Sequence, residues 1–311
     1  RKCAADPDAV RTAMVRGHQI VPKYGSRITD VLKGMLRPAL IPDRGNRFVV
    51  ADWSSIEARI TPWCADSMEG AAKLELFRNG EDIYKVNAAA TFHKNIKDIT
   101  NDERQIGKVQ ELACCFAGST GAFAAMGRIY GLSLSDHEAK RMVSGWRIAN
   151  PWAVPYWGAI ERAYTTAMRN PNREFKAGRV VYLFDKQHLW YMLPSGRILC
   201  YPFARFDSEG NITYAKASWK PAADAKEWPR ARLWVGIAVE NITQATANDI
   251  LRHCLRGLDS VVAHVHDEII LETDRPHEEE SELIRIMTVP PKWADGLPLA
   301  VETKILSRYG K

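Results

Sequence analysis

Acidic side chains sit in two short apolar stretches that lie far apart in the chain. Residues 261–273 read VVAHVHDEIILET, in which β-branched arms flank a polar centre that holds Asp267 and Glu268. Residues 47–52 read RFVVAD, so a second apolar run ends in Asp52. Two acids presented by two strands can bind a pair of divalent cations, which is the usual apparatus of in-line phosphoryl transfer. Asp267 could equally serve only its turn, since Asp suits tight turns.

A second group of candidate residues is cationic. Thr100 and Glu103 have the spacing of a capping box, which opens a helix. Arg104 and Lys108 are four residues apart on that helix and therefore project side by side. Two such cations repel each other by a few tenths of a kcal/mol on an isolated helix, and a bound phosphate chain would reverse the sign. The pattern predicts a phosphate-binding helix that ends at Gly118.

Short strands and amphipathic helices are expected to position these residues. Strand-like arms around a two- or three-residue turn predict a tight hairpin at residues 261–273. Ser54 and Glu57 form a further capping box, so one interpretation of Glu57 is that it bonds back to the Ser54 amide and closes a helix. Further elements are expected in order along the chain: helices in residues 81–92, 135–147, 155–168 and 236–255, and a hairpin in residues 189–203.

Four segments together resemble a known family. Residues 51–59, ADWSSIEAR, and residues 265–268, VHDE, resemble motifs A and C of the family A DNA polymerases, the DNA polymerase I type, and most closely their bacteriophage members. The helix of Arg104 and Lys108 resembles motif B, the nucleotide-binding helix of the fingers. Residues 239–251, VENITQATANDIL, resemble the palm helix before motif C. The resemblance covers residues 30–311 in the expected order.

This resemblance implies a metal-dependent catalytic centre. Asp52 and Asp267 would bind two Mg²⁺ ions, for which Mn²⁺ could substitute, and Glu268 would be the third catalytic residue. One ion would activate the primer 3′-hydroxyl, and the other would arrive with the triphosphate. No further carboxylate cluster in the sequence suggests a 3′ to 5′ proofreading site.

The resemblance also implies a nucleotide site. Arg104 and Lys108 would hold the triphosphate. Glu57 would lie under the sugar and exclude a 2′-hydroxyl. Leu112 stands where cellular members carry Phe or Tyr, and Phe116 stands where a Tyr is usual, so an aromatic plane for stacking survives only at Phe116. The alternative for Phe116 is packing in the core.

Four residues are expected to contact DNA on the same grounds. Gln244 stands where a glutamine reaches the minor groove near the primer terminus, whose acceptors are common to all base pairs. The other three are Asn241, His266 and Arg59.

The expected fold class is α+β. The family's palm is an antiparallel sheet with backing helices, and its mainly helical fingers are inserted between motifs A and C. We expect residues 1–46 to be an N-terminal approach segment, from the end of the thumb to the start of the palm. Residues 47–66 would form the palm with motif A, residues 67–205 the fingers with motif B and a connecting hairpin, and residues 206–311 the palm with motif C and the C-terminus.

Composition narrows the class of protein. With 311 residues, 46% of them hydrophobic, the chain can bury a substantial core, and its net charge of +6 suits a polyanionic partner. Six cysteines without C-x-x-C spacing indicate reduced thiols in an intracellular compartment, here the cytoplasm of a host cell. No apolar run reaches the roughly 18 residues that span a bilayer. The start at Arg1 rather than Met favours a piece of a longer polypeptide.

The expected function is template-directed DNA synthesis, in phage replication, with primer-template DNA and deoxynucleoside triphosphates as partners. An upstream exonuclease or thumb region, or a replisome partner, would lie outside this chain. A single-subunit RNA polymerase relative is an alternative that Glu57 argues against. A catalytically silent DNA-binding replication scaffold is another, and the acids argue against it. A metal-dependent nuclease would use the acids but leave Arg104 and Lys108 without a role.

Overall fold

The computed structural model describes residues 6–16, 24–132, 134–216 and 228–310. The chain divides into two compact units. Unit 1 comprises Arg1–Ser54, Leu251–Val289 and Ala300–Lys311, and unit 2 comprises Ser55–Ile250 and Pro290–Leu299.

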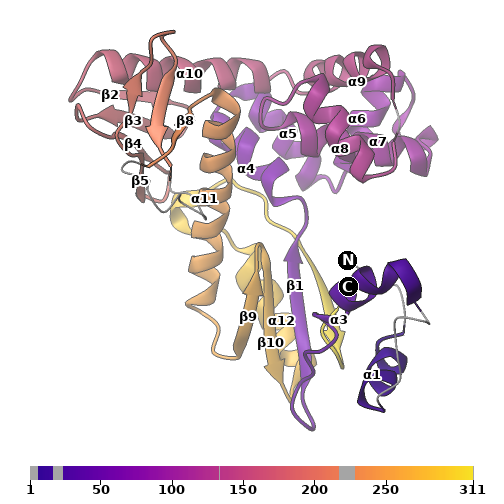
Figure 1. Cartoon of the computed structure of the whole chain (residues 1–311). Helices are drawn as coiled ribbons and strands as arrows, with labels where there is room; N and C mark the ends of the chain where they lie inside the picture. Colours follow the sequence, from indigo (N-terminus) through magenta and orange to yellow (C-terminus); the bar gives the residue numbers. More distant parts are fainter. Residues whose placement is uncertain (1–5, 17–23, 133, 217–227, 311) are drawn as a thin grey trace. The chain divides into compact units, whose positions relative to one another are not determined.

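Unit 1 is built on a four-stranded antiparallel sheet in the order β11-β1-β10-β9 (Figure 1). Its central strands therefore come from opposite ends of the sequence, and the β9–β10 hairpin forms one edge. Its strands are β1 (Arg47–Trp53), β9 (Val261–Val265), β10 (Glu268–Thr273) and β11 (Val301–Leu306).

The two faces of this sheet are covered differently. Side chains alternate along a strand, so Phe48 and Val50 share one face while Trp53 lies on the other. Helix α12 (Pro276–Thr288) packs on the Trp53 face, where the indole Nε1–H donates to the carbonyl of Met287 at 2.8 Å. On the first face, Phe48 and Val50 pack with Tyr309. Asp52 lies two residues after Val50, so its side chain shares the face of Phe48 and Val50.

The N-terminal part of unit 1 lies against the tail that follows β11. It holds α1 (Pro7–Val15), η1 (Gly25–Arg27) and α3 (Ile28–Met35). The Arg308 guanidinium pairs with Asp8 at 2.7 Å and donates to the carbonyl of Pro38 at 2.5 Å. These contacts tie the end of the chain to the segment that leads into β1.

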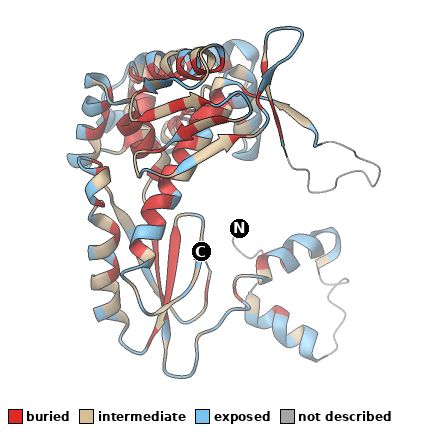
Figure 2. Ribbon diagram, turned by 90° about the vertical axis from the view of Figure 1, so that its left-hand side faces the viewer, coloured by how far each residue is buried: buried red, intermediate tan, exposed pale blue. Residues whose placement is uncertain are grey.

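Unit 2 begins with a group of packed helices. Helices α6, α7 and α9 pack on one another. Figure 2 colours the chain by burial and shows that buried and exposed residues occur within the same helices. Gly107 allows the closest approach, since a Cβ there would lie 2.0 Å from the carbonyl oxygen of Tyr84. The elements are α4 (Ile56–Ala65), α5 (Met68–Arg78), α6 (Ile83–Phe92), η2 (Ile96–Asp98), α7 (Asn101–Cys114), α8 (Thr120–Ile129), α9 (Asp136–Ala149) and α10 (Ala153–Arg169).

The second half of unit 2 holds two small antiparallel sheets. The first, in the order β2-β3-β4-β5, lies against α10, and the second has the order β6-β7-β8 (Figure 1). Helix α11 (Val235–Leu255) follows them and belongs to unit 2 as far as Ile250. The remaining elements are β2 (Glu174–Ala177), β3 (Val180–Phe184), β4 (Leu189–Met192), β5 (Ile198–Tyr201), β6 (Arg205–Phe206), β7 (Ile212–Ala215), β8 (Arg230–Arg232) and η3 (Lys292–Ala294).

Antiparallel sheets combined with many helices confirm the expected α+β class. The division into approach segment, palm and fingers stays a prediction. In the described part of the chain no helix is long and apolar enough to cross a membrane. Four cysteines are buried and Cys200 is half-buried, whereas Cys3 lies outside the described residues.

The predicted end of the phosphate-binding helix was wrong. Helix α7 starts at a full capping box between Thr100 and Glu103, as expected, but ends at Cys114 rather than Gly118. Ala117 has a left-handed φ of 58°, which stops helical propagation. Gly118 then passes close to the helix end, because a Cβ there would lie 1.8 Å from the carbonyl oxygen of Ala113. Phe116 therefore belongs to the turn and not to the helix.

Candidate active site

Backbone pairing brings the predicted acids of unit 1 together. In the antiparallel register of β1 and β10, Asp52 lies directly opposite Glu268, and Asp267 precedes Glu268 in the turn. Directly opposed residues point to the same face, with Cβ atoms about 4.5–5.5 Å apart. On the other side, β11 places Glu302 opposite Asp52. Sequence reasoning missed Glu302, because only the pairing of β11 with β1 reveals it.

The turn that carries Asp267 is tight. His266 has a left-handed φ of 55° and is exposed, while Asp267 is half-buried. Glu268 already belongs to β10, so the polar turn consists of His266 and Asp267. The structure thus confirms the predicted hairpin and places His266 at its tip. A contact of His266 with DNA stays a prediction.

Glu268 is held by a residue near the end of the chain. The Tyr309 hydroxyl donates a hydrogen bond to the Glu268 carboxylate, and both residues are buried. Burial, together with this bond to a negative group, raises the pKa of Tyr309 to about 12, so the phenol keeps its proton at neutral pH. The sequence resemblance included Tyr309 but gave it no role.

The donor chemistry of this acidic end fits Mg²⁺ or Mn²⁺. Asp52 and Asp267 offer hard carboxylate oxygens, and Mg²⁺ commonly binds one or two carboxylates and completes its shell with waters and substrate phosphates. Within residues 6–16, 24–132, 134–216 and 228–310, no group of three or more His, Cys, Asp or Glu is arranged to hold a metal alone.

In unit 2, the Arg104 side chain forms an ion pair with Asp82. Its Nε lies 2.5 Å from Oδ2 of Asp82, and its guanidinium lies 5.2 Å from the ring centre of Tyr84. Asp82 also caps α6 by accepting from the Tyr84 and Lys85 amides. Asp82 therefore offsets the repulsion expected between Arg104 and Lys108, and sequence reasoning missed it.

Lys108 lies one turn further along α7. Its Nζ is 5.6 Å from the ring centre of Tyr130, and the side chain is half-buried. Arg104 and Lys108 thus share a helical face, as predicted from their spacing. Each rests beside a tyrosine ring, an arrangement that favours a cation at either position.

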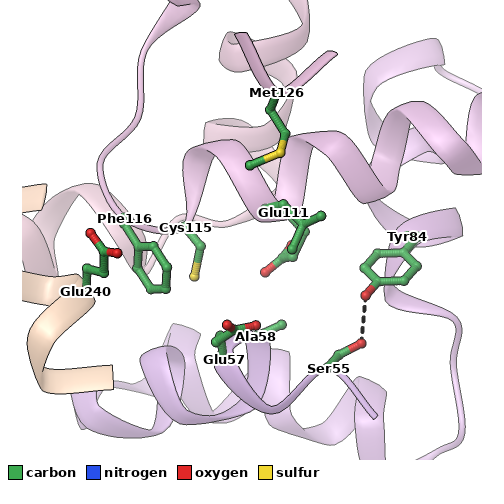
Figure 3. A pocket seen from close by; sticks show the side chains of 10 residues that line it. Ser55, Glu57, Ala58, Tyr84, Glu111, Cys115, Phe116, Met126 and Glu240 are labelled. Atoms are coloured by element: carbon green, nitrogen blue, oxygen red, sulfur yellow. Dashed lines mark hydrogen bonds between the residues drawn. The ribbon is translucent and has the colours of Figure 1, made fainter. Parts of the chain in front are cut away.

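A pocket of about 250 Å³ opens beside α7 (Figure 3). In Figure 3, Glu57 and Ser55 face Glu111 and Cys115 across the cavity, with Phe116 near Glu240. The Tyr84 hydroxyl lies 2.9 Å from that of Ser55. The lining combines predicted site residues with residues that sequence reasoning missed: Ser55, Glu57, Ala58, Tyr84, Glu111, Leu112, Cys115, Phe116, Met126 and Glu240.

Glu111 lines this pocket and is held in a buried polar network. Its Oε2 accepts hydrogen bonds from Asn87 at 2.6 Å and from Trp146 at 2.9 Å, and lies 3.5 Å from Nζ of Lys73. Lys73 also donates to Asn150 at 2.7 Å. Burial lowers the pKa of Lys73, and the negative charge of Glu111 opposes this shift. The Glu111 carboxylate thus connects its own helix α7 with α5, α6 and α9.

The alternative interpretation of Glu57, as a residue that caps a helix, was wrong. Ser55, with a left-handed φ of 55°, occupies the cap position of α4 and makes no side-chain cap bond. The Ser54 amide, which Glu57 was expected to accept from, donates instead to the carbonyl of Ala300 at 2.8 Å. The Glu57 carboxylate accepts from the exposed Gln244 amide at 2.8 Å. Two predicted site residues thus bind each other.

Leu112 and Phe116 both line the pocket and are half-buried. Phe116 is therefore only partly packed, and its role in stacking stays a prediction. An aromatic side chain beside the sugar-gate candidate Glu57 is consistent with the stacking role that the resemblance implies.

Two residues that were predicted to contact DNA, Arg59 and Asn241, form contacts within unit 2. Arg59 is only 7% exposed, lies over the ring of Phe77 at 4.2 Å and donates to the carbonyl of Pro298 at 3.2 Å. Burial also lowers its pKa to about 10. This placement argues against the predicted DNA contact of Arg59, because leaving it would cost these interactions. Asn241 is half-buried and donates to the Tyr201 hydroxyl at 3.1 Å.

Comparison with known proteins agrees with this arrangement. Residues 19–167 match the family described as DNA polymerase family A. The DNA polymerase of Bacillus phage SP02 is 33% identical over 313 residues, which is 98% of this chain and 48% of that protein. DNA polymerase I of Pseudomonas aeruginosa is 23% identical over 285 residues, which is 88% of this chain and 26% of that protein.

A solved structure shares the fold. The POL domain of Pol1 from M. smegmatis, in complex with DNA primer-template and dNTP, superposes with a TM-score of 0.58 at 19% identity, covering 88% of this chain and 42% of that one. This chain spans about half the length of the phage relative. On these grounds the chain is a homologue of the family A DNA polymerases.

Proposed function

We propose that this chain is the polymerising part of a template-directed DNA polymerase that adds deoxynucleotides to a primer 3′-hydroxyl. The observation that carries the proposal is the register of β1 and β10, which sets Asp52 opposite Glu268 and next to Asp267. Segments more than 200 residues apart are paired so that their acids meet on one face. Like charges placed directly opposite one another on paired strands are unfavourable, and a bound cation would offset part of that cost.

Asp52 and Asp267 would hold two divalent cations, Mg²⁺ or Mn²⁺, because carboxylate oxygens on neighbouring strand ends are the hard ligands that such ions bind. When bound, the ions supply Lewis acidity and neutralise charge during in-line displacement at phosphorus. The carboxylates of Asp52 and Asp267 would bind these ions and offset the repulsion between their positive charges. Glu268, with one oxygen held by Tyr309, would present its other oxygen beside Asp52.

The nucleotide would bind in unit 2. Arg104 and Lys108 offer two cationic groups one turn apart on α7, which suits the oxygens of a triphosphate. The pocket beside them would take the sugar, with Phe116 offering a flat apolar surface and Glu57 a carboxylate. A 2′-hydroxyl would meet the Glu57 carboxylate, which now accepts a hydrogen bond from the Gln244 amide.

Primer-template DNA and deoxynucleoside triphosphates are the proposed substrates, and the M. smegmatis complex names the same two ligands. Gln244 presents an exposed amide donor that could read the shared minor-groove acceptors. Asn241 and His266 would be further DNA contacts, whereas Arg59 is left out because it is buried. The proposed setting is phage replication in the cytoplasm of a host cell.

Primer extension by the purified chain tests this function. The assay uses a labelled primer-template, Mg²⁺, and deoxy- or ribonucleoside triphosphates in parallel. The proposal expects template-dependent extension with deoxynucleotides and weak extension with ribonucleotides. Equal use of ribonucleotides would favour an RNA polymerase relative, and DNA binding without extension would favour a silent scaffold. Either result would overturn the proposal.

A further inference from the structure

We propose that Tyr309 is a positioning residue of the acidic end of the sheet, which fixes the Glu268 carboxylate beside Asp52 and so sets how tightly the acids hold a divalent cation. The inference concerns the same acids as the proposed function and rests on it for the identity of the bound ion. It adds a residue that contacts neither metal nor substrate.

The tyrosine ring is fixed independently of the acids. Tyr309 is 4% exposed and packs against Phe48, Val50 and Ile270 on the face of the sheet that carries Asp52. The Arg37 guanidinium lies over the ring at 5.4 Å from its centre. The ring is thus held between the sheet and the segment before β1.

The backbone of the tail is fixed as well. The Tyr309 amide donates to the carbonyl of Leu40 at 3.0 Å. The preceding residue, Arg308, bonds to Pro38 and Asp8. None of these contacts uses the phenol hydroxyl. Removing the hydroxyl alone should therefore leave the ring and the tail in place.

The hydroxyl makes one directed contact, a donated hydrogen bond to Oε1 of Glu268. Glu268 is 3% exposed, so its carboxylate has little freedom to find water instead. A phenol suits this place because it orients a carboxylate without neutralising it. A Lys or Arg there would hold the carboxylate equally well, but its positive charge would compete with a metal cation for the acids.

The matching substitution is Tyr309→Phe, with Tyr164→Phe as a control. Tyr164 is also buried, and its hydroxyl also donates to a carboxylate, that of Glu161 at 3.5 Å on α10. Partners that orient metal ligands change metal affinity or activity by about 10- to 100-fold when lost. We expect Tyr309→Phe to raise the Mg²⁺ concentration for half-maximal extension about tenfold. The KM for deoxynucleotide should stay within about twofold, as expected for a change that acts through the metal.

A second measurement does not depend on turnover. Mn²⁺ is added to the protein without DNA or nucleotide, and the rise in Tm is recorded for wild type, Tyr309→Phe, Tyr164→Phe and Glu268→Gln. A ligand that binds only the folded state raises Tm according to its affinity. We expect a smaller rise for Tyr309→Phe than for Tyr164→Phe. In the Glu268→Gln background, Tyr309→Phe should change the rise little, because the oriented carboxylate is already gone.

Equal Mg²⁺ dependence of wild type and Tyr309→Phe, or equal Mn²⁺-induced rises in Tm, would overturn the inference, whatever the effect on stability. If Tyr309→Phe fails to fold, Tyr309→His keeps an aromatic ring with an N–H donor. It should then retain more of the Mn²⁺ response than Tyr309→Leu. The reverse order would overturn the inference. A wild-type chain that binds Mn²⁺ but extends no primer counts against the proposed function and leaves Tyr309 testable by Tm.

Discussion

The acids of unit 1 and the pocket of unit 2 are built by different means. Asp52 and Glu268 are neighbours because two backbones pair, so hydrogen bonds between strands set their spacing. The pocket instead takes its lining from α4, α6, α8, α11, α7 and the turn after α7, and its floor depends on side chains such as Glu111. Strand pairing sets where the backbone of each acid lies, although the direction of the Glu268 carboxylate still depends on the Tyr309 hydroxyl. In the pocket, the buried polar network sets both, so a change in one member should disturb the others.

The largest expected effect comes from the acids themselves. Asp52→Ala or Asp267→Ala should lower extension by about 10³-fold or more, because each removes a carboxylate that holds a metal. The sheet should survive, since neither residue belongs to the buried apolar core. Single-turnover extension and DNA binding are measured on the same protein. Glu302→Gln is the control, because Glu302 lies opposite Asp52 but is exposed and has no assigned role. Turnover near wild type in either Ala variant would remove the two-metal assignment.

The same comparison explains what the sequence could and could not predict. The hairpin of β9 and β10 follows from β-branched arms around a polar turn, and the start of α7 follows from Thr100 and Glu103. Both signals are local. The position of Glu302 opposite Asp52 and the contact of Tyr309 with Glu268 depend on pairing and packing between distant segments, which no local pattern encodes.

The wrong capping role of Glu57 has a similar cause. Ser54 and Glu57 have the local spacing of a capping box, but the Ser54 amide is taken by the distant Ala300 carbonyl. Likewise, Lys73 and Glu111 are 38 positions apart, and no local sequence pattern in either segment predicts that they share a buried network. Tertiary partners decided these positions, so spacing along the sequence was insufficient.

The second prediction tests the network under the pocket. Glu111→Leu should lower the free energy of unfolding by about 3–5 kcal/mol, because the charge of Lys73 would be left buried without its partner. The matched variant is the double substitution Lys73→Met/Glu111→Leu, which removes both charges and should lose much less. Denaturant unfolding measures both. A double variant as unstable as the single one would mean that packing, and not the unpaired charge, is what fails.

The third prediction concerns the cations on α7. Lys108→Ala should raise the nucleotide KM and also slow the chemical step, because its charge is needed most as negative charge moves onto pyrophosphate. We expect a loss of about 10- to 100-fold in kcat/KM, the size of a charge-assisted hydrogen bond. Lys97→Ala, an exposed lysine on η2, serves as control. If Lys108→Ala matches the control in single-turnover kinetics, α7 is a solvated structural helix and the motif B assignment fails.

The smallest expected effect is at Glu57 in the pocket of unit 2, where an effect on stability can be separated from an effect on sugar selection. Glu57 accepts one exposed hydrogen bond from Gln244 and caps no helix, so Glu57→Ala should change stability by less than about 0.5 kcal/mol. If the carboxylate excludes a 2′-hydroxyl, the same variant should improve ribonucleotide use relative to deoxynucleotide use by about 3- to 10-fold, since one missing polar obstacle is worth about one kcal/mol.

Gln244→Ala is the matched control for this last effect. It breaks the same hydrogen bond but leaves the acid in the pocket, so the ribonucleotide-to-deoxynucleotide ratio should stay near wild type while extension from a mispaired primer end changes. The ratio is measured by single-nucleotide insertion with ATP and dATP on one template. Should both variants shift the ratio equally, Glu57 would act only when Gln244 holds it, and sugar exclusion would belong to the pair. A ratio unchanged in Glu57→Ala would show that the sugar is read elsewhere in the pocket, with Phe116 as the next residue to test, because it lines the same pocket.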